Sequence, residues 1–202
     1  MTSTPATAPA SSPVSGPVSS PVSSPAPSLG GERADLLEAL RKHRGLLRVT
    51  VQDLSDDQAR TRSTVSELTL GGLIKHVAAT EKHWARFILE GPDREPDIDW
   101  ANVDWSNPPP EVAAYADGFR MLEDETLHGL LEGYDEVAAA TDELVATVDL
   151  DASHPLPPAP WFPPGAAWSA RRVLIHIVAE TAQHAGHADI IREAIDGQKS
   201  MG

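Results

Sequence analysis

The sequence predicts an all-α protein: a four-helix bundle preceded by a disordered N-terminal extension. Apolar residues recur at steps of three and four along four long segments, as they do on the buried face of an amphipathic helix. No segment shows the apolar and polar alternation of a strand. Two long connections, residues 91–125 and 149–168, indicate at least one crossover, because a purely up-and-down bundle needs only short turns.

Residues 1–30 form the predicted extension. They consist mainly of Ser, Pro, Ala, Thr and Val in short repeats, and no charged side chain precedes Glu32. Such a composition offers little to bury in a core, so we expect disorder there. The segment lacks the basic start and the continuous apolar run of a secretion signal, and we therefore expect a cytoplasmic protein. Residues 31–202 are then the bundle domain.

The first two long helices are separated by a connection. The first helix is predicted over residues 32–53, and residues 55–68 form the connection, with one short helical turn behind a cap near Ser55. Thr69 caps the second long helix. Gly91-Pro92 ends it, because this pair cannot continue a helix.

The second half of the bundle follows the first long connection. That connection contains a predicted short helix at 111–119. Thr126 caps a third long helix that continues through Val148. Ser169 caps the fourth, which is expected to end near Ile195, just before a glycine.

Charge and cysteine content exclude several classes of function. The chain has 30 acidic and 16 basic residues, a formal net charge of -14, which argues against nucleic acids and anionic membranes as partners. It has no cysteine, so it holds no disulfide, no thiolate metal ligand and no cysteine nucleophile. Any metal must therefore be bound by His, Asp or Glu.

The fourth helix carries a stripe of potential metal ligands. Glu180, His184 and His187 fall within roughly 60° of one another around the helix, because steps of four and seven residues nearly close whole turns. Apolar residues on both sides of the stripe give the helix a packing surface, so the stripe need not face water. A buried polar stripe requires a chemical reason.

A catalytic zinc-type ion needs about three protein ligands and keeps one position open. Glu180 and His184, four residues apart, supply two ligands from one helix. His76, early in the second long helix, is our choice for the third. His187 is the rival to Glu180, and the spacing alone does not choose between them.

Several other polar and aromatic residues are expected to have structural or supporting roles. His83 and His176 are expected to pack between helices or to orient a ligand. His43, His128 and His154 are expected to be structural or exposed. The tryptophans at 84, 100, 105, 161 and 168 are interpreted as core and loop anchors rather than a substrate cage. Arg171 and Arg172 form a solvated helical turn, with binding of a small-molecule carboxylate as the alternative.

Two motifs resemble a known family. The run from Thr69 to Trp84, TLGGLIKHVAATEKHW, is followed far downstream by the run from Trp168 to Asp189, WSARRVLIHIVAETAQHAGHAD. Together they resemble the DinB-like superfamily, and more narrowly its actinobacterial mini-circle branch, which is related to mycothiol-dependent S-transferases. The resemblance covers about residues 32–200.

The resemblance implies an up-down-down-up bundle that binds a divalent metal, with zinc as the expected ion. It implies His76 as the ligand from the second long helix, and Glu180 and His184 as the ligands from the fourth. Many relatives carry histidine where this chain has Glu180, and glutamate there is similar to the mycothiol-dependent isomerase relatives. His187 takes the place of a family glutamine, which implies a supporting or substrate-binding role.

The primary hypothesis is a metal-dependent thiol S-transferase with a detoxification role. A low-molecular-weight thiol such as mycothiol would be activated for attack on a small-molecule electrophile. The aromatic loops at 97–105 and 155–168 would form the electrophile pocket, and Arg171 or Arg172 would bind a carboxylate of the thiol. Two alternatives stay open: a metal-dependent hydrolase or isomerase, and a non-catalytic bundle that binds a metal or ligand or pairs as a homodimer through an exposed helix face.

Overall fold

The computed structural model describes residue 1 and residues 29–92, 103–104, 106–157 and 161–200. The predicted extension lies almost wholly outside these ranges, so its disorder stays a prediction. None of the described helices is both long and apolar enough to cross a membrane.

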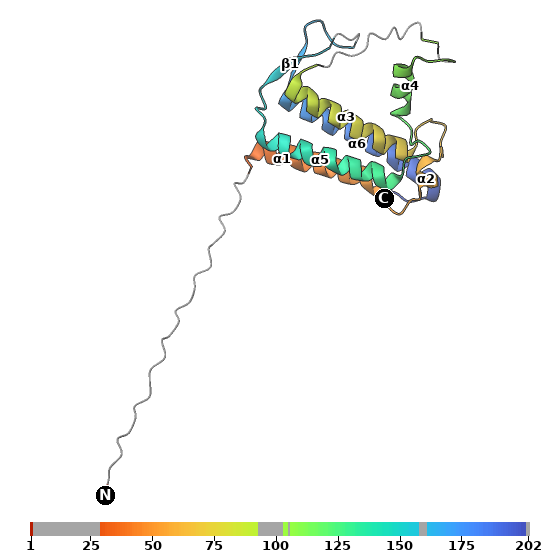
Figure 1. Ribbon diagram of the computed structural model, residues 1–202, viewed down its shortest axis with the longest axis horizontal. Coiled ribbons are helices and arrows are strands. Elements are labelled where there is room, and N and C mark those ends of the chain that lie inside the picture. Colours follow the sequence, from red (N-terminus) through yellow and green to blue (C-terminus); the bar gives the residue numbers. More distant parts are fainter. Residues whose placement is uncertain (2–28, 93–102, 105, 158–160, 201–202) are drawn as a thin grey trace.

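The described chain is a bundle of four long helices, which confirms the predicted fold class (Figure 1). Its elements are α1 (Gly31–Val49), α2 (Asp56–Arg60), α3 (Leu70–Glu90), α4 (Pro110–Asp117), α5 (Leu127–Thr147), β1 (Ser153–Pro155), β2 (Ala167–Ser169) and α6 (Ala170–Asp196). Helices α1 and α6 run in one direction and α3 and α5 in the other, so the order is up-down-down-up. The crossover is the connection from α3 to α5, whose two ends lie at opposite ends of the bundle.

The predicted caps begin the long helices. The hydroxyls of Thr69, Thr126 and Ser169 each accept a hydrogen bond from the backbone N–H three residues further on, at 3.1, 3.1 and 3.2 Å. Each bond satisfies one of the N–H groups that the first turn of a helix leaves unpaired. Glycine ends α3 and α6, because Gly91 and Gly197 have φ of 80° and 81°, where a side chain would be strained.

Helix α1 ends four residues before the predicted end at residue 53. The segment after Val49 turns, and Asp53 adopts a positive φ of 58°. The guanidinium of Arg192 in α6 donates to the backbone carbonyls of Thr50 and Gln52, at 3.0 and 2.8 Å. This distant side chain stabilises the turn, and the apolar periodicity of the segment cannot reveal it.

A small antiparallel sheet occupies a connection that was predicted to lack strands. β1 pairs with β2 in the register Ser153 to Ser169 and Pro155 to Ala167, ahead of α6. Strands of three residues are too short to show alternation in the sequence. The two short strands therefore correct the expectation that the chain contains no strand.

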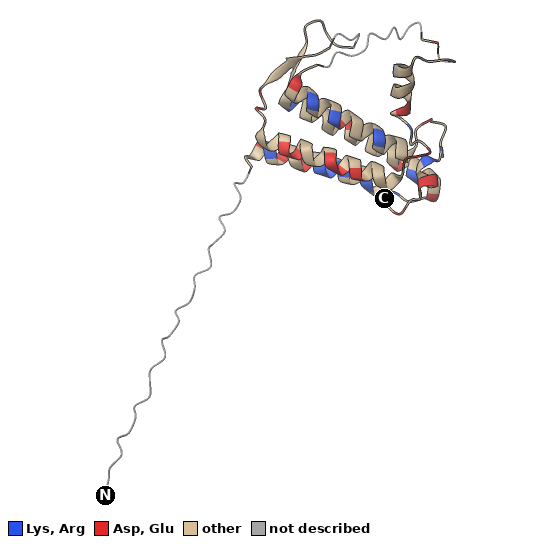
Figure 2. Cartoon of the chain, in the orientation of Figure 1, with Lys and Arg blue, Asp and Glu red and all other residues tan. Residues whose placement is uncertain are grey.

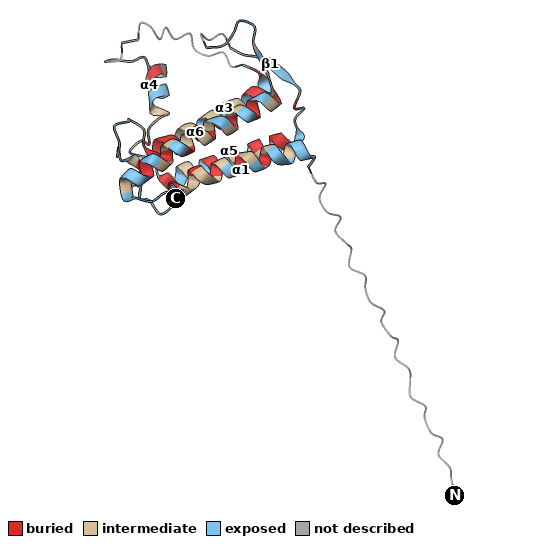
Figure 3. Ribbon diagram, turned by 180° about the vertical axis from the view of Figure 1, so that it is seen from behind, coloured by how far each residue is buried: buried red, intermediate tan, exposed pale blue. Residues whose placement is uncertain are grey.

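The core consists of two apolar clusters with a polar layer between them. On α3, Val77 belongs to the cluster near α2 and Phe87 to the cluster near the sheet. The polar layer comprises Arg44 of α1, Glu81 of α3, Thr141 and Asp142 of α5, and Thr181 of α6. Figure 3 shows the buried stripes that face the interior, and Figure 2 shows charged residues along the outer sides of the helices.

Candidate metal centre

The side chains of His76, Glu180 and His184 meet between α3 and α6. One potential ligand atom from each residue lies within 4.8 Å of the other two. Nε2 of His184 is 3.7 Å from a carboxylate oxygen of Glu180. Ligands around one tetrahedral zinc ion lie about 3.4 Å apart, so a small contraction of this cluster would form such a shell. Within the described residues, no other group of three or more His, Asp or Glu side chains meets this criterion.

Partial burial favours the neutral, metal-binding form of both imidazoles. Burial lowers the pKa of His76, although the Glu180 carboxylate opposes this shift. Burial lowers the pKa of His184 as well. The nearby His76 and His187 rings lower it further, whereas the Glu180 carboxylate opposes the shift. A histidine must be unprotonated at the coordinating nitrogen to bind a metal. The lowered pKa values of His76 and His184 therefore favour the form of each imidazole that can bind a metal.

A close contact between α3 and the segment after α4 positions His76. Its ring stacks on Phe119, with the ring centres 4.3 Å apart and the planes at 22°. One turn earlier on α3, a Cβ at Gly72 would lie 2.2 Å from the carbonyl oxygen of Phe119. Only glycine permits this approach, so Gly72 of the sequence motif allows Phe119 to lie on the His76 ring.

His176 lies beside Glu180 and is held by aromatic rings. Its Nε2 is 3.7 Å from the other carboxylate oxygen of Glu180. The rings of Trp84 and Trp168 contact the His176 ring, at centre distances of 4.9 and 5.0 Å. These contacts restrict the His176 ring, and His176 in turn lies against the carboxylate that the site needs.

His187 lies beside the cluster rather than within it. Its Nδ1 is 3.5 Å from Nδ1 of His184, on the same stripe of α6. The three side chains that the structure brings together are His76, Glu180 and His184. The geometry therefore favours Glu180 over His187 as the third ligand. A supporting role for His187 stays a prediction.

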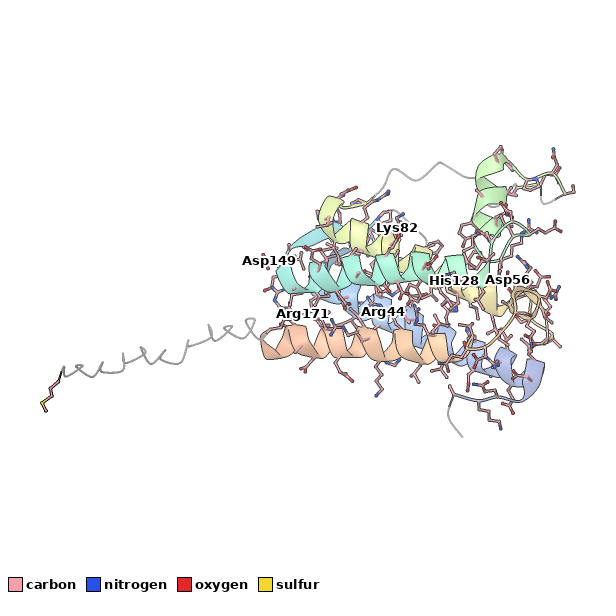
Figure 4. The ribbon with its side chains drawn as sticks, turned by 60° about the horizontal axis from the view of Figure 1, so that its bottom comes forward. Arg44, Asp56, Lys82, His128, Asp149 and Arg171 are labelled. Carbon is pink, nitrogen blue, oxygen red and sulfur yellow. The ribbon has the colours of Figure 1, made fainter. Side chains whose placement is uncertain are left out.

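The remaining predicted site residues lie further out. His83 is exposed, and its ring contacts Trp84 at 5.5 Å. The guanidinium of Arg171 donates to the carboxylates of Glu32 and Asp151, at the end of the bundle where α1 begins (Figure 4). Arg172 is exposed, and its guanidinium lies 4.1 Å from the centre of the Trp168 ring. Binding of a cofactor carboxylate by either arginine stays a prediction.

Part of the predicted electrophile pocket lies outside the described residues. Within the loop at 97–105 only residues 103 and 104 are described, so Trp100 and Trp105 lie outside the described residues. In the loop at 155–168, Phe162 packs its ring against Trp168 at 5.5 Å, whereas Trp161 is 75% exposed. The second loop thus contributes an aromatic ring next to the residues that surround His176.

A buried ion pair in the polar layer was not predicted from the sequence. Arg44 donates two hydrogen bonds to the Glu81 carboxylate, at 2.5 and 3.1 Å, and a third to Asp142 at 2.7 Å (Figure 4). Burial alone would lower the pKa of Arg44, but the bonds to Glu81 and Asp142 raise it. The signal was available: Glu81 follows Val77 by one turn on the apolar side of α3, where a charged residue requires a partner.

The fold and the site define a helical bundle with a histidine and carboxylate cluster between two of its helices. The chain belongs to the mycothiol-S-transferase family, whose model matches residues 35–197 and so includes both sequence motifs. Among solved structures, the chain is similar to a conserved protein from Enterococcus faecalis, with a TM-score of 0.55 and 16% identity over 82% of this chain and 97% of that one. This similarity concerns the fold. No curated protein matches the chain.

Proposed function

We propose that the protein is a divalent-metal-dependent S-transferase that joins a low-molecular-weight thiol such as mycothiol to an electrophilic small molecule. The observation that carries the proposal is the convergence of His76, Glu180 and His184 in a chain of the mycothiol-S-transferase family. The absence of cysteine supports it as well, because a thiol nucleophile must then come from a co-substrate.

The donor set fits a zinc-like ion. Two imidazoles and one carboxylate are ordinary zinc ligands, and three protein ligands leave one position open. A bound ion of this kind would lower the pKa of a thiol at the open position and so supply a thiolate near neutral pH. Phe119 holds the His76 ring, and His176 lies against Glu180, so two of the three proposed ligands have neighbours that restrict them.

The aromatic residues near the centre are the proposed surface for the electrophile. Trp84 and Trp168 stack with ring centres 5.1 Å apart, and both contact His176. Such rings bind apolar groups and exclude water from the thiol.

The decisive experiment compares wild type, His184→Ala and the control His128→Ala. His128 lies on α5 with a side chain that is 83% exposed. We expect purified wild type and the control to contain about one divalent metal per chain and to consume thiol with a generic electrophile. We expect His184→Ala to lose both the metal and at least about a hundredfold in turnover.

Other outcomes would decide between the alternatives. Unchanged metal content and turnover in His184→Ala would refute the proposed centre. Turnover that needs metal but no thiol would instead identify a hydrolase or isomerase. Metal binding without turnover across a range of thiols and electrophiles would favour a non-catalytic bundle.

A further inference from the structure

The outward face of α6 is uncharged over four turns. Between Arg172 and Glu193, the exposed residues of this helix are Ile175, Ala179, Gln183, Gly186 and Ile190. The two isoleucines are 49% and 64% exposed. The outward face of a surface helix ordinarily carries charged and polar groups, and this chain has 46 charged residues to provide them. An apolar stripe of this length is suited to being covered by another surface.

The stripe is symmetric about a point between Ala182 and Gln183. Ile175 and Ile190 lie at equal distances from that point along the helix, and so do Ala179 and Gly186. The same holds for the two charged residues at its ends, Arg172 and Glu193. A second copy of α6, packed antiparallel about a twofold axis through that point, would place isoleucine against isoleucine and small residue against small residue.

The charges at the two ends complement each other in this arrangement. Each Arg172 would face Glu193 of the second copy, which gives two such pairs per dimer. Within its own chain, Arg172 stacks on Trp168, and Glu193 lies 3.0 Å from Nζ of Lys199 with half its side chain exposed. Both therefore remain accessible from the outward side. A parallel arrangement would instead bring like charges together.

This arrangement accounts for the glycine at position 186. A Cβ at Gly186 would meet no atom of its own chain within 4 Å, so packing within the monomer does not require glycine there. Glycine in a helix interior costs about 0.5–1 kcal/mol relative to alanine. Opposite Ala179 of a second copy, it would let two helix backbones approach at the short end of the usual 8–10 Å range.

We infer that the protein forms a twofold homodimer through the outward face of α6, with Ile175, Gly186 and Ile190 at the contact. The interface is separate from the proposed transferase chemistry, because the metal ligands point toward α3. It can therefore be right or wrong independently of the proposed function. Because a net charge of -14 per chain repels a second copy, contact is favoured where the contacting surface itself adds no like-charge pairs, as along this stripe.

The first test places a charge within the stripe, at the close contact between Gly186 and Ala179 of the second copy. Wild type should sediment as a dimer at micromolar concentration, and Gly186→Glu should weaken the dimer at least about a hundredfold. Gly133→Glu is the matched control, because Gly133 of α5 is also exposed and a Cβ there also meets nothing. It should leave the dimer intact. Circular dichroism melting checks that both variants fold.

The second test uses the complementary ends. Arg172→Glu and Glu193→Arg should each weaken the dimer about tenfold, since each creates two like-charge contacts. An equimolar mixture of the two variants should restore association, because in the mixed dimer both end contacts are again between opposite charges. The double variant Arg172→Glu/Glu193→Arg should restore it as well.

Three results would overturn the inference. The first is a wild type that stays monomeric up to about 1 mM, whether the face is free or is covered by the chain's own N-terminal residues. The second is a dimer that Gly186→Glu does not weaken, which would place the interface on another face. The third is a mixture of the two charge variants that associates no better than either variant alone, which would exclude the antiparallel register.

Discussion

The bundle holds two groups of polar side chains near its middle, and they differ in how their charges are satisfied. In the polar layer, Arg44 meets Glu81 and Asp142 at hydrogen-bonding distances of 2.5–3.1 Å. In the candidate metal centre, Glu180 approaches His184 only to 3.7 Å, beyond a hydrogen bond. The first group is complete within the chain. The second brings one potential ligand atom each of His76, Glu180 and His184 within 4.8 Å of the other two, as the metal site that we propose would require.

The largest effect we predict breaks the polar layer. Arg44→Met leaves the Glu81 carboxylate buried without its cation and should lower the free energy of unfolding by about 3–5 kcal/mol. The double variant Arg44→Met/Glu81→Leu removes both charges and should be clearly more stable than Arg44→Met. Urea unfolding of the three proteins measures this. If the double variant had the lowest free energy of unfolding of the three, the ion pair would be stabilising the fold by more than the neutralisation of its own charges.

The second prediction concerns the metal centre. Zinc at a hundred times its dissociation constant should raise the free energy of unfolding of metal-free wild type by about 2.7 kcal/mol. The same zinc concentration should have no such effect on His76→Ala, which lacks one ligand of the cluster. Arg44→Met, although destabilised, should still gain from zinc. An equal gain in His76→Ala would place the ion elsewhere.

The third prediction connects backbone packing to the centre. Gly72→Ala places a methyl group 2.2 Å from the carbonyl oxygen of Phe119, and should cost about 1–3 kcal/mol of stability. It should also weaken zinc binding, because it displaces the ring that stacks on His76. Gly133→Ala, in open space on α5, is the control and should not destabilise the protein. Calorimetric zinc titrations would show whether the two effects occur together.

The smallest predicted effect is a pH dependence of the metal-free protein. Burial lowers the pKa of His76 and His184 in the folded state, against an unfolded value of about 6.5. Below that pH the unfolded chain binds more protons than the folded one, so the free energy of unfolding falls as the pH decreases from about 6.5. Above it, the two histidines contribute nothing.

The same pH series tests the origin of this effect. Replacing both His76 and His184 with glutamine should reduce the slope between about pH 7 and 5.5. His128→Gln, on the exposed side of α5, should leave it unchanged. An unchanged slope in the double variant would assign the pH dependence to other groups.

The sequence was sufficient for much of the fold. Thr69, Thr126 and Ser169 predict where α3, α5 and α6 begin, because a cap depends only on residues within one turn. The true end of α1 depends on Arg192, which is distant in the sequence, and the small sheet depends on pairing between two short segments. Local patterns carry no information about such contacts.

The candidate site was predictable to the same extent. Glu180 and His184 share a helical stripe, so their proximity follows from spacing alone. That His76 joins them depends on the packing of α3 against α6, which the family resemblance implied and the spacing did not. The stack of Phe119 on His76 was not predictable from the sequence. It depends on the close approach that Gly72 permits, and Phe119 lies in a connection whose sequence shows no periodicity.

The up-down-down-up order also determines when the centre can form during synthesis. His76 leaves the ribosome early, but its proposed partners Glu180 and His184 lie on the last helix, which is the neighbour of α3 in the bundle. Contacts between segments so far apart form late, because a long loop must close first. A nascent chain therefore cannot bring these three side chains together, and the proposed metal centre would form only in the finished domain.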